Sequence, residues 1–368
     1  MKRIGNIFDK VISLENLHLA DEKARKGKLK SYGVRIHDKN REANLLALHE
    51  SLKNGTFKTS KYHVFTIHEP KERLIYRLPY FPDRILHHAI MNVLEPIWVS
   101  VFTKDTYSCI KKRGIHACVK SVKWALREDI AGTRYCLKID IRKFYPSIKH
   151  DVLKGIVRRK IKDARLLSLL DEIIDSTDNP GLSIRNYTTD LFTGKMVVSA
   201  INGQSVPIGN YLSQYFANLV MAYFDHWLKE VKRVKYYWRY ADDIVILAPN
   251  KEFLHELLHE IRAYLRDNLK LRIKHNYQVF PVESRGIDFL GYVFYHSHTL
   301  LRKAIKQKLC RRVAKLNKRK IVPTKEYYKQ QICSWWGWCK YCDSINLVNK
   351  LSKQFPYEIK FNRSKRPL

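Results

Sequence analysis

Three aspartates interrupt stretches of sequence that are otherwise apolar. Asp140 ends the run CLKID, and Asp242 and Asp243 stand side by side in YADDIVIL. Carboxylates among Val, Ile and Leu are costly to bury unless a cation balances them. That cation could be an Arg or Lys side chain, with Arg239 close by in the sequence. It could also be a divalent metal, because carboxylate oxygens suit Mg²⁺, and two such ions can activate an attacking 3′-hydroxyl and stabilise a departing pyrophosphate.

Short strands must hold these aspartates in place. Residues 136–141 form an apolar run that predicts a strand, and residues 235–249 predict a β-hairpin with the paired aspartates at its bend. Another hairpin, with its bend at residues 69–72, carries Arg73 and Arg77. The segments QVFPV and DFLGYVFY predict a last pair of strands.

Helices are predicted where apolar residues recur four apart. The predicted helices cover residues 83–98, with Pro96 marking the end, 215–231 and 253–265. Strands that alternate with helices over residues 61–292 predict an α+β fold, with helices packed on one face of a sheet. Residues 1–60 predict a polar, helical N-terminal extension, and residues 293–368 predict a small, basic helical unit.

The charge of the chain indicates a polyanionic partner. Lys and Arg number 69 against 35 Asp and Glu in 368 residues, which gives a formal net charge of +34. At 45% hydrophobic residues the chain is too apolar for a disordered tail, and so basic a protein attracts nucleic acid or an anionic membrane surface. We expect no membrane insertion, because no apolar stretch approaches the ~18 residues of a spanning helix. The start, MKRIGNIFDK, also lacks the apolar core of a secretion signal.

Residues 301–320 concentrate this charge, with ten Lys or Arg and no acid. Apolar residues nevertheless recur along one face of the run, at Ile305, Leu309, Val313 and Leu316. A charge run is often only a solvated surface, but a helix with one buried face and one basic face also suits contact with a phosphate backbone. The candidates for that contact are Arg302, Lys303, Lys306, Arg311, Arg312 and Lys315.

The seven cysteines are scattered and odd in number, which favours a reduced cytoplasmic protein over a disulfide framework. Cys339 and Cys342, with Cys333 upstream, have the spacing of a metal site. No second pair of this kind and no nearby His accompany them, so small buried thiols are the favoured interpretation. The histidines form no ligand set in the sequence, and we expect His87 and His88 to pack or to contact a template.

The residues around the aspartates resemble the catalytic core of reverse transcriptases. The matching segments follow in the family's order: the fingers hairpin with its arginines, Asp140 with Phe144 and Tyr145, a helix start with Gly209, Ser213 and Gln214, the YADD segment, and a basic region near Lys274. The segment that looks like the primer grip is Phe289, Leu290, Gly291 and Tyr292. The resemblance covers roughly residues 10–345. It implies a right-hand polymerase with fingers and an antiparallel palm sheet in residues 61–292 and a thumb in residues 293–368.

One branch of the family resembles this chain in more detail. VPIGNYLSQYFAN, residues 206–218, looks like the reverse transcriptases of diversity-generating retroelements, where an aliphatic residue precedes Gly-Asn and Ser-Gln follows. Group II intron reverse transcriptases have Gln before that Gly, at the position of Ile208 here. Residues 16–28, 69–90, 140–148 and 280–303 also resemble this branch. It implies cDNA whose errors concentrate opposite template adenines, and mutagenic retrohoming, in which copies of a template-repeat RNA diversify a target gene.

Two alternatives remain beside this interpretation. Retron, abortive-infection and CRISPR-associated reverse transcriptases, which serve defence, share the YADD core. A non-catalytic RNA-binding protein on the same fold is a third possibility, against which the intact Asp140, Asp242 and Asp243 argue. For the retroelement branch, the implied partners are template RNA, a DNA or RNA primer, dNTPs and a small, basic accessory protein. The implied location of this bacterial or phage-encoded protein is the cytoplasm, and no membrane partner is expected.

The resemblance also implies roles for single residues. Asp140, Asp242, Asp243 and the carbonyl oxygen of Ile141 would bind two Mg²⁺ ions, for which Mn²⁺ can substitute. The residues expected to bind or select the incoming dNTP are Arg73, Arg77, Tyr145, Ile208, Gln214 and Lys274. A guanidinium can hold triphosphate oxygens in a bidentate way, an aromatic ring can exclude a 2′-hydroxyl, and Lys274 could protonate pyrophosphate. Ordinary packing, solubility or backbone binding would account for the same residues.

Overall fold

The computed structural model describes residues 2–68, 72–178, 183–184, 203–319 and 321–357. The chain divides into two compact units, each assembled from three segments. The first unit comprises residues 1–104, 141–231 and 262–273, and the second comprises residues 105–140, 232–261 and 274–368.

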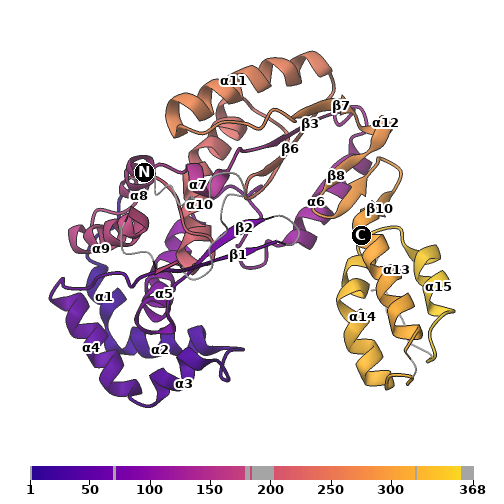
Figure 1. The fold of residues 1–368 in the computed structure, drawn as a ribbon. Helices are drawn as coiled ribbons and strands as arrows, with labels where there is room; N and C mark the ends of the chain where they lie inside the picture. Colours follow the sequence, from indigo (N-terminus) through magenta and orange to yellow (C-terminus); the bar gives the residue numbers. More distant parts are fainter. Residues whose placement is uncertain (1, 69–71, 179–182, 185–202, 320, 358–368) are drawn as a thin grey trace, which may run out of the picture. The chain divides into compact units, whose positions relative to one another are not determined.

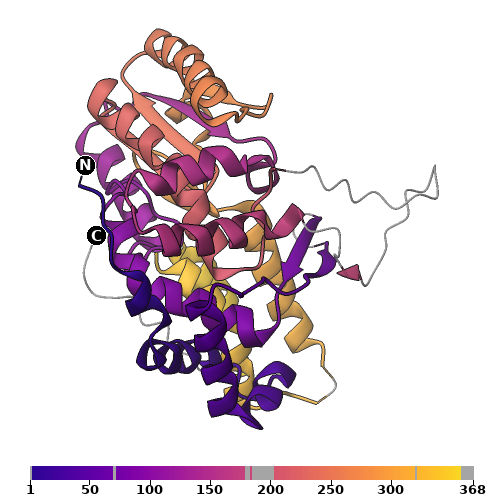
Figure 2. The same ribbon diagram turned by 90° about the vertical axis from the view of Figure 1, so that its left-hand side faces the viewer.

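Helices form most of the first unit. The N-terminal helices are α1 (Phe8–Ile12), α2 (Leu14–Arg25), α3 (Tyr32–Asp38) and α4 (Arg41–Lys53), gathered beside α5 (Ile85–Val99) in Figures 1 and 2. The predicted helical character of residues 1–60 is confirmed. Helix α5 continues past Pro96 to Val99, so the expectation that Pro96 ends the helix was wrong. In its last turns a proline removes only one backbone hydrogen bond, which a buried helix can tolerate.

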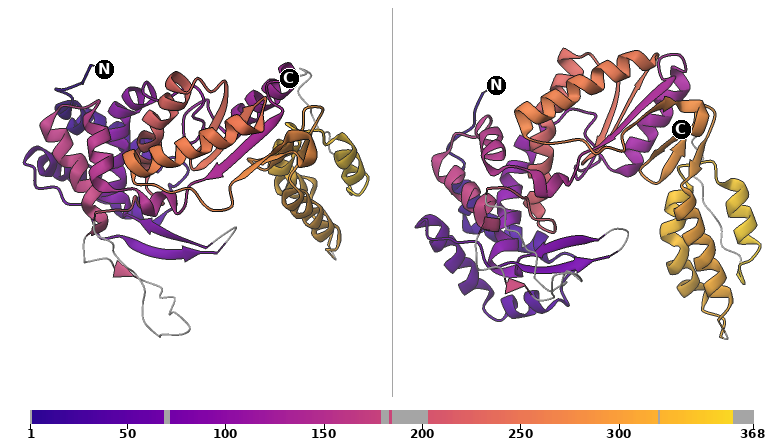
Figure 3. Two further views of the ribbon diagram at one scale, coloured as in Figure 1. Left: turned by 90° about the horizontal axis from the view of Figure 1, so that it is seen from above. Right: turned by 45° about the horizontal axis from the view of Figure 1, so that its top comes forward.

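The predicted fingers hairpin is present in the first unit. Strands β1 (His63–Ile67) and β2 (Arg73–Arg77) pair antiparallel, with Ile67 opposite Arg73 and His63 opposite Arg77. The predicted bend lies mostly outside the described residues. Strand β4 (Ser183–Ile184) pairs with β1 in parallel. The hairpin extends from the helices of this unit in Figure 3, so the arginines of β2 are exposed.

A further group of helices completes the first unit: α7 (Phe144–Ser147), α8 (His150–Arg158), α9 (Ala164–Asp175) and α10 (Tyr211–His226). Short turns of other helix types adjoin helices of this unit: η1 (Tyr80–Arg84) lies before α5, η2 (Ser176–Asp178) after α9, and η3 (Trp227–Val231) after α10. Helix α8 packs against both α9 and α10. The loops and hairpin predicted over residues 175–207 fall largely outside the described residues.

An antiparallel sheet forms the centre of the second unit. Its strands, in spatial order, are β5 (Tyr236–Tyr240), β6 (Asp243–Ala248), β3 (Tyr135–Asp140) and β7 (Gln278–Pro281). Helix α6 (Ile115–Glu128) packs on one face, where Val119 and Val122 belong to the same buried core as Trp238 and Val245. Side chains alternate between the faces of a strand, so Asp140 and Asp243 lie on this same face at the end of their strands. Helix α11 (Lys251–Leu269) follows β6.

The strands after β7 differ from the prediction that QVFPV and DFLGYVFY pair with each other. Strand β7 instead joins the edge of the large sheet beside β3. After the short helix α12 (Val282–Arg285), β8 (Ile287–Phe289), β9 (Tyr292–Phe294) and β10 (Thr299–Leu301) form a separate antiparallel sheet. The apolar run contains a tight bend at Leu290 and Gly291, both with positive φ, which periodicity alone does not reveal.

Helices end the described part of the second unit, and Figure 1 shows them beside one another: α13 (Lys303–Asn317), α14 (Lys325–Cys339) and α15 (Ile345–Ser352). Leu309, Val313 and Leu316 are buried on one face of α13, as the sequence predicted. The predicted boundary at residue 292 coincides with the first residue of β9, so the small sheet extends across it. The division into extension, fingers with palm, and thumb stays a prediction.

Candidate active site

The three aspartates come together at one end of the large sheet in the second unit. Strands β3 and β6 pair so that Asp140 lies directly opposite Asp243. Asp242 precedes it in the bend between β5 and β6, where Ala241 has a positive φ of 55°. Pairing of Tyr240 with Asp243 closes the bend. The predicted hairpin with both aspartates at its bend is therefore present.

The closeness of these acids makes their charged forms less favourable. Like charges directly opposite each other across a sheet are unfavourable. Burial, with the charges of Asp140 and Asp242 adding to it, raises the pKa of Asp243 to about 6, against the opposing charge of Lys138. Burial and then the charge of Asp140 raise the pKa of Asp242 as well. A cation beside the group would lower the cost of keeping these carboxylates charged.

Two lysines supply only part of that positive charge. The Nζ atom of Lys274 lies 2.7 Å from Oδ2 of Asp140, and Nζ of Lys138 lies 3.8 Å from Oδ1 of Asp243, beyond hydrogen-bonding distance. Oδ1 of Asp140 and Oδ1 of Asp243 are buried and have no hydrogen-bond partner among the described residues. Arg239, which the sequence offered as a partner, donates a hydrogen bond to the carbonyl oxygen of Ala241 at 3.1 Å.

These carboxylates fit a divalent cation. Buried oxygens without partners, beside acids whose charged forms are disfavoured, are what a hard metal ion such as Mg²⁺ would satisfy. The backbone beside them is held in place, because Lys274 donates its N–H to the carbonyl oxygen of Asp140 at 2.9 Å. Ile141 follows Asp140 and is fully buried. Its carbonyl oxygen stays a predicted ligand.

Lys138 is a residue that the sequence analysis missed. It stands two positions before Asp140 in β3 and therefore on the same face of the sheet. The signal was visible as a lysine within the apolar run CLKID. The sequence alone did not link this lysine to the aspartates of the hairpin, because only the pairing with β6 brings Lys138 near Asp243.

The first unit brings several of the predicted nucleotide-binding residues together. Arg73 and Arg77 share one face of β2 with Ile75, and this face meets the turn that contains Ile208 and Gly209. The backbone N–H of Tyr76 donates to the carbonyl oxygen of Ile208 at 2.8 Å. Gly209 has a φ of +121°, and a Cβ there would lie 3.0 Å from the carbonyl oxygen of Tyr76. Glycine therefore allows the hairpin and the turn to approach closely.

A basic pocket with a volume of about 260 Å³ opens beside this turn. Its lining comprises Arg77, Leu78, Arg84, His87, His88, Gly209, Asn210, Tyr211 and Gln214. Two predicted dNTP-binding residues, Arg77 and Gln214, are thus joined in one pocket. Burial and then the charge of Arg84 lower the pKa of His88 to about 4, which leaves a neutral imidazole. The sequence did not reveal Arg84 as part of this group.

Tyr145 is joined to the same turn through the backbone. It lies half-buried in α7, with its ring edge-on to Phe144 at a centroid distance of 5.5 Å. The carbonyl oxygen of Tyr145 accepts a hydrogen bond from the N–H of Val206 at 2.9 Å, two residues before Ile208. Tyr145, Ile208, Gln214 and the arginines of β2 therefore belong to one connected region of the first unit. Lys274 belongs instead to the second unit, beside Asp140.

The segment predicted as primer grip is a tight hairpin in the second unit. Leu290 and Gly291 form the bend, and Phe289 pairs with Tyr292 across it. The hydroxyl of Tyr292 donates to the carbonyl oxygen of Trp338 at 3.0 Å. A Cβ on Gly291 would lie 2.5 Å from the Trp338 ring. Helix α14 thus fixes the position of this bend.

The basic residues predicted to follow a nucleic-acid backbone lie at or near the exposed side of α13. Lys303, Lys306, Arg311 and Lys315 are exposed, and Arg302 and Arg312 are half-buried. Arg302 forms an ion pair with Asp288. The cysteines that could have suggested zinc are free thiols, and Cys339 and Cys342 are buried as expected.

A group that the sequence did not reveal lies in the first unit. Donor atoms of His150, Asp175 and Asp178 lie within 4.8 Å of one another. The histidine begins α8 while the acids come from the end of α9 and from η2, so no local spacing links them. The expectation that the histidines take part in no such cluster was therefore incomplete.

The central part of the chain matches a known protein family. The family described as reverse transcriptase (RNA-dependent DNA polymerase) matches residues 67–294, which is more than half of the chain. The chain belongs to this reverse transcriptase family. The match contains β2 of the fingers hairpin, the three aspartates and the segment predicted as primer grip.

Among curated proteins, the chain is similar to protein YkfC of Escherichia coli (strain K12), with 26% identity over 260 residues that cover 61% of this chain and 62% of YkfC. It is also similar to the group II intron-encoded protein LtrA of Lactococcus lactis subsp. cremoris, with 20% identity over 315 residues, 68% of this chain and 49% of LtrA. The chain thus spans about half to three fifths of the length of these relatives.

A solved structure shares the fold. The structure of apo telomerase from Candida tropicalis superimposes with a TM-score of 0.50 and 11% sequence identity, covering 82% of this chain and 60% of that chain. This reverse transcriptase therefore has the α+β, right-hand polymerase fold that the sequence predicted. No helix among its described residues is both long and apolar enough to cross a membrane.

Proposed function

We propose that this reverse transcriptase is an RNA-directed DNA polymerase that adds dNTPs to a primer 3′ end by two-metal nucleotidyl transfer. The observation that supports this most directly is the carboxylate group. Asp140 and Asp243 oppose each other across β3 and β6, and each has one buried oxygen without a hydrogen-bond partner among the described residues. A structural group of this kind would be costly without a bound cation.

Asp140 and Asp242 would hold both ions, with the carbonyl oxygen of Ile141 as a further ligand and Asp243 beside the primer end. When bound, two Mg²⁺ ions supply charge that activates the 3′-hydroxyl and stabilises the departing pyrophosphate. Mn²⁺ also suits carboxylate ligands. Lys274, now paired with Asp140, has the donor group that a leaving pyrophosphate needs for protonation.

The first unit would bind and select the incoming nucleotide. Arg73 and Arg77 are exposed on one face of the fingers hairpin, where a guanidinium can hold phosphate oxygens. Tyr145 would exclude a 2′-hydroxyl, and Ile208 and Gln214 would lie beside the nascent pair. The hydrogen bond from Tyr76 to the carbonyl oxygen of Ile208 supports this grouping, because it ties the hairpin to the turn.

The second unit would hold the nucleic acid. The rigid bend formed by Phe289, Leu290, Gly291 and Tyr292 would contact the primer. The basic residues of α13 named above would follow the phosphate backbone of the template RNA and primer. Their separation from the buried apolar face of α13 supports this role, because such a helix can pack and bind at the same time.

We further propose that the product is a mutagenic cDNA of a template-repeat RNA, in a diversity-generating retroelement, made with a small, basic accessory protein. The aliphatic Ile208 supports this, since it offers no amide to the nascent pair. A side chain without hydrogen-bonding capacity discriminates less strongly against mispairs than one that can leave a polar group unpaired.

Primer extension tests the polymerase activity. Wild type and Asp242→Ala would be assayed on poly(rA) and on heteropolymeric RNA with Mg²⁺, and template–primer binding would be measured in parallel. We expect extension by wild type alone and equal binding by both. Binding without extension by the wild-type protein would contradict the proposal and identify an RNA-binding protein.

Sequencing the cDNAs tests the mutagenic branch. Errors clustered opposite template adenines would support the diversity-generating role. An even, low error spectrum would contradict it and favour a defence-type reverse transcriptase.

A further inference from the structure

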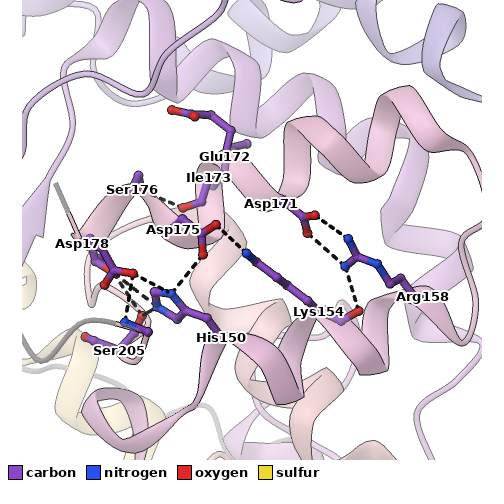
Figure 4. Close-up of polar contacts among 12 residues, drawn as sticks. His150, Lys154, Arg158, Asp171, Glu172, Ile173, Asp175, Ser176, Asp178 and Ser205 are labelled. Carbon is purple, nitrogen blue, oxygen red and sulfur yellow. Dashed lines mark hydrogen bonds and ion pairs between the residues drawn. The ribbon is translucent and has the colours of Figure 1, made fainter.

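His150 occupies a buried site in which every neighbour of its ring nitrogens can accept a hydrogen bond (Figure 4). The residue is only 3% exposed. Its Nδ1 lies 3.2 Å from Oδ1 of Asp175 and 3.4 Å from Oδ2 of Asp178, and its Nε2 lies 2.9 Å from the carbonyl oxygen of Ser205. Carboxylate and carbonyl oxygens only accept, so a ring nitrogen forms these bonds as a donor. The hydroxyl of Thr177 also lies 3.4 Å from Nε2.

Side chains already occupy the polar atoms around His150. Lys154 forms an ion pair with the other oxygen of Asp175 (Figure 4). The atoms also have the types of a metal site, but each ring nitrogen of His150 already has an oxygen partner, and Asp175 already has a lysine partner. The group therefore acts as a polar clamp.

This clamp holds the end of a short backbone ribbon. The N–H of His150 donates to the carbonyl oxygen of Gly203, the N–H of Ser205 donates to that of Ile148, and the N–H of Val206 donates to that of Tyr145, each at 2.9 Å. Oδ2 of Asp178 also accepts from the N–H of Gly203 at 3.0 Å. Residues 145–150 and 203–206 are thus fastened together, with His150 at the end away from Tyr145.

The ribbon leads to residues that we place at the nucleotide. Tyr145 begins one side of the ribbon, and Ile208 follows Val206 on the other side. Ile208 in turn accepts from Tyr76, between the arginines of β2. A shift of the Gly203–Ser205 segment would therefore move both Tyr145 and Ile208. Both residues are placed at the nucleotide and not at the carboxylates, so such a shift should alter nucleotide binding and sugar choice more than the chemical step.

We propose that His150 is a positioning residue for nucleotide selection, acting through the ribbon on Tyr145 and Ile208. The inference rests on the roles proposed for those two residues. His150 touches no substrate in this arrangement. Its side chain fixes the backbone that carries the residues in contact with the sugar and the nascent pair.

His150→Gln tests this inference against a matched control. His226, also in the first unit, has Nδ1 at 2.6 Å from Glu230 and Nε2 at 2.8 Å from the carbonyl oxygen of Val101, so it makes the same kinds of bond away from the ribbon. For His150→Gln we expect the KM for dNTP to rise ~10-fold, kcat to stay within ~2-fold, and the preference for dNTP over rNTP to fall ~10-fold. His226→Gln should leave all three values at the wild-type level.

Asp178→Asn provides a second, milder variant, since it keeps the shape of a partly exposed side chain and removes its charge. It should shift KM and sugar preference in the same direction as His150→Gln. Equal values for wild type and both clamp variants would overturn the inference, as would a loss of kcat without a change in KM or sugar preference.

Tyr145→Ala separates this inference from the proposed function. If Tyr145→Ala loses sugar preference while the clamp variants do not, only the role of His150 fails. If Tyr145→Ala keeps full sugar preference, the proposed role of Tyr145 fails, and with it the route by which His150 would act.

Discussion

The two units assemble their functional residues over different sequence distances. In the second unit, Asp242 and Asp243 are neighbours in one hairpin, and a single strand pairing brings Asp140 opposite them. In the first unit, the nucleotide-binding candidates come from strand β2 of the fingers hairpin, a short helix at Tyr145 and a turn at Ile208. They are joined mainly by backbone hydrogen bonds to Ile208 and Tyr145.

Under the proposed function, this difference would separate catalysis from nucleotide selection. The carboxylate group needs charge in one place, which a rigid antiparallel sheet supplies. The nucleotide-binding group needs several surfaces around one ligand, and segments far apart in the chain supply them. Changes in the second unit should therefore abolish catalysis outright, whereas changes in the first unit should alter affinity and choice of nucleotide.

The largest effect is expected from Asp140→Asn. The substitution removes one charge from the crowded acids and one metal ligand, so kcat should fall at least ~1,000-fold while template–primer binding stays unchanged. Single-turnover primer extension and a filter-binding assay measure the two quantities. Asp129→Asn is the control, because Asp129 is a hydrogen-bonded acid of the same unit that contacts Lys235 and Tyr236. Retention of normal kcat in Asp140→Asn would remove Asp140 from the catalytic group.

A smaller effect is expected from Arg73→Ala in the first unit. Loss of a guanidinium from the triphosphate should lower kcat/KM for dNTP by ~10- to 100-fold, mostly through KM. Arg73→Lys should recover part of the loss, because lysine keeps the charge without the planar fork. Arg165→Ala, which removes an exposed arginine paired with Asp9, is the control. A loss in Arg77→Ala with none in Arg73→Ala would assign the triphosphate to Arg77 instead.

The contrast between short-range and long-range assembly also explains which elements the sequence could predict. The strands of the YADD hairpin, the strand that ends at Asp140 and the helix over residues 211–226 were all visible in short-range patterns. The pairing after β7 was not, because no charged residue interrupts DFLGYVFY after Asp288. Its bend at Leu290 and Gly291 depends on backbone angles and on packing against Trp338.

Residues that act through distant partners were hardest to find. Arg84 of η1 and His88 of α5 share a pocket with Arg77 of β2 and Gln214 of α10. No short-range pattern links these four elements. His150 meets its carboxylates only when α8 packs against α9. Periodicity predicts which face of an element is buried, but it does not say which polar groups from other elements will lie against it.

Long-range polar contacts should also contribute to the stability of the first unit. Burial lowers the pKa of His226, but its hydrogen bonds to Glu230 and to the carbonyl oxygen of Val101 outweigh this and raise the pKa above its ordinary value. A raised folded-state pKa contributes stability below the unfolded value of about 6.5, and the contribution is lost as pH rises through the folded value. His226→Gln should therefore lower the free energy of unfolding more at about pH 5.5 than at about pH 9.

Urea unfolding of wild type and His226→Gln at both pH values measures this difference. His255→Gln is the control, since His255 is an exposed histidine of α11. An equal loss at both pH values would mean that the charge of His226 does not contribute.

The smallest effect, and the one that distinguishes selection from catalysis most directly, is expected from Ile208→Gln. The hydrogen bond from Tyr76 holds the backbone of Ile208 in place. A glutamine here should therefore add hydrogen-bonding capacity beside the proposed nascent pair without moving the turn. Misincorporation opposite template adenine should fall about 2- to 5-fold, with kcat for correct dNTPs within about 2-fold of wild type. Sequencing of cDNA from a heteropolymeric RNA measures the error spectrum. Ile208→Leu, which preserves the aliphatic character, is the control and should keep the wild-type error spectrum. If Ile208→Gln also keeps that spectrum while extending normally, the turn does not govern fidelity. The pocket lined by Arg77 and Gln214 would then be the next candidate.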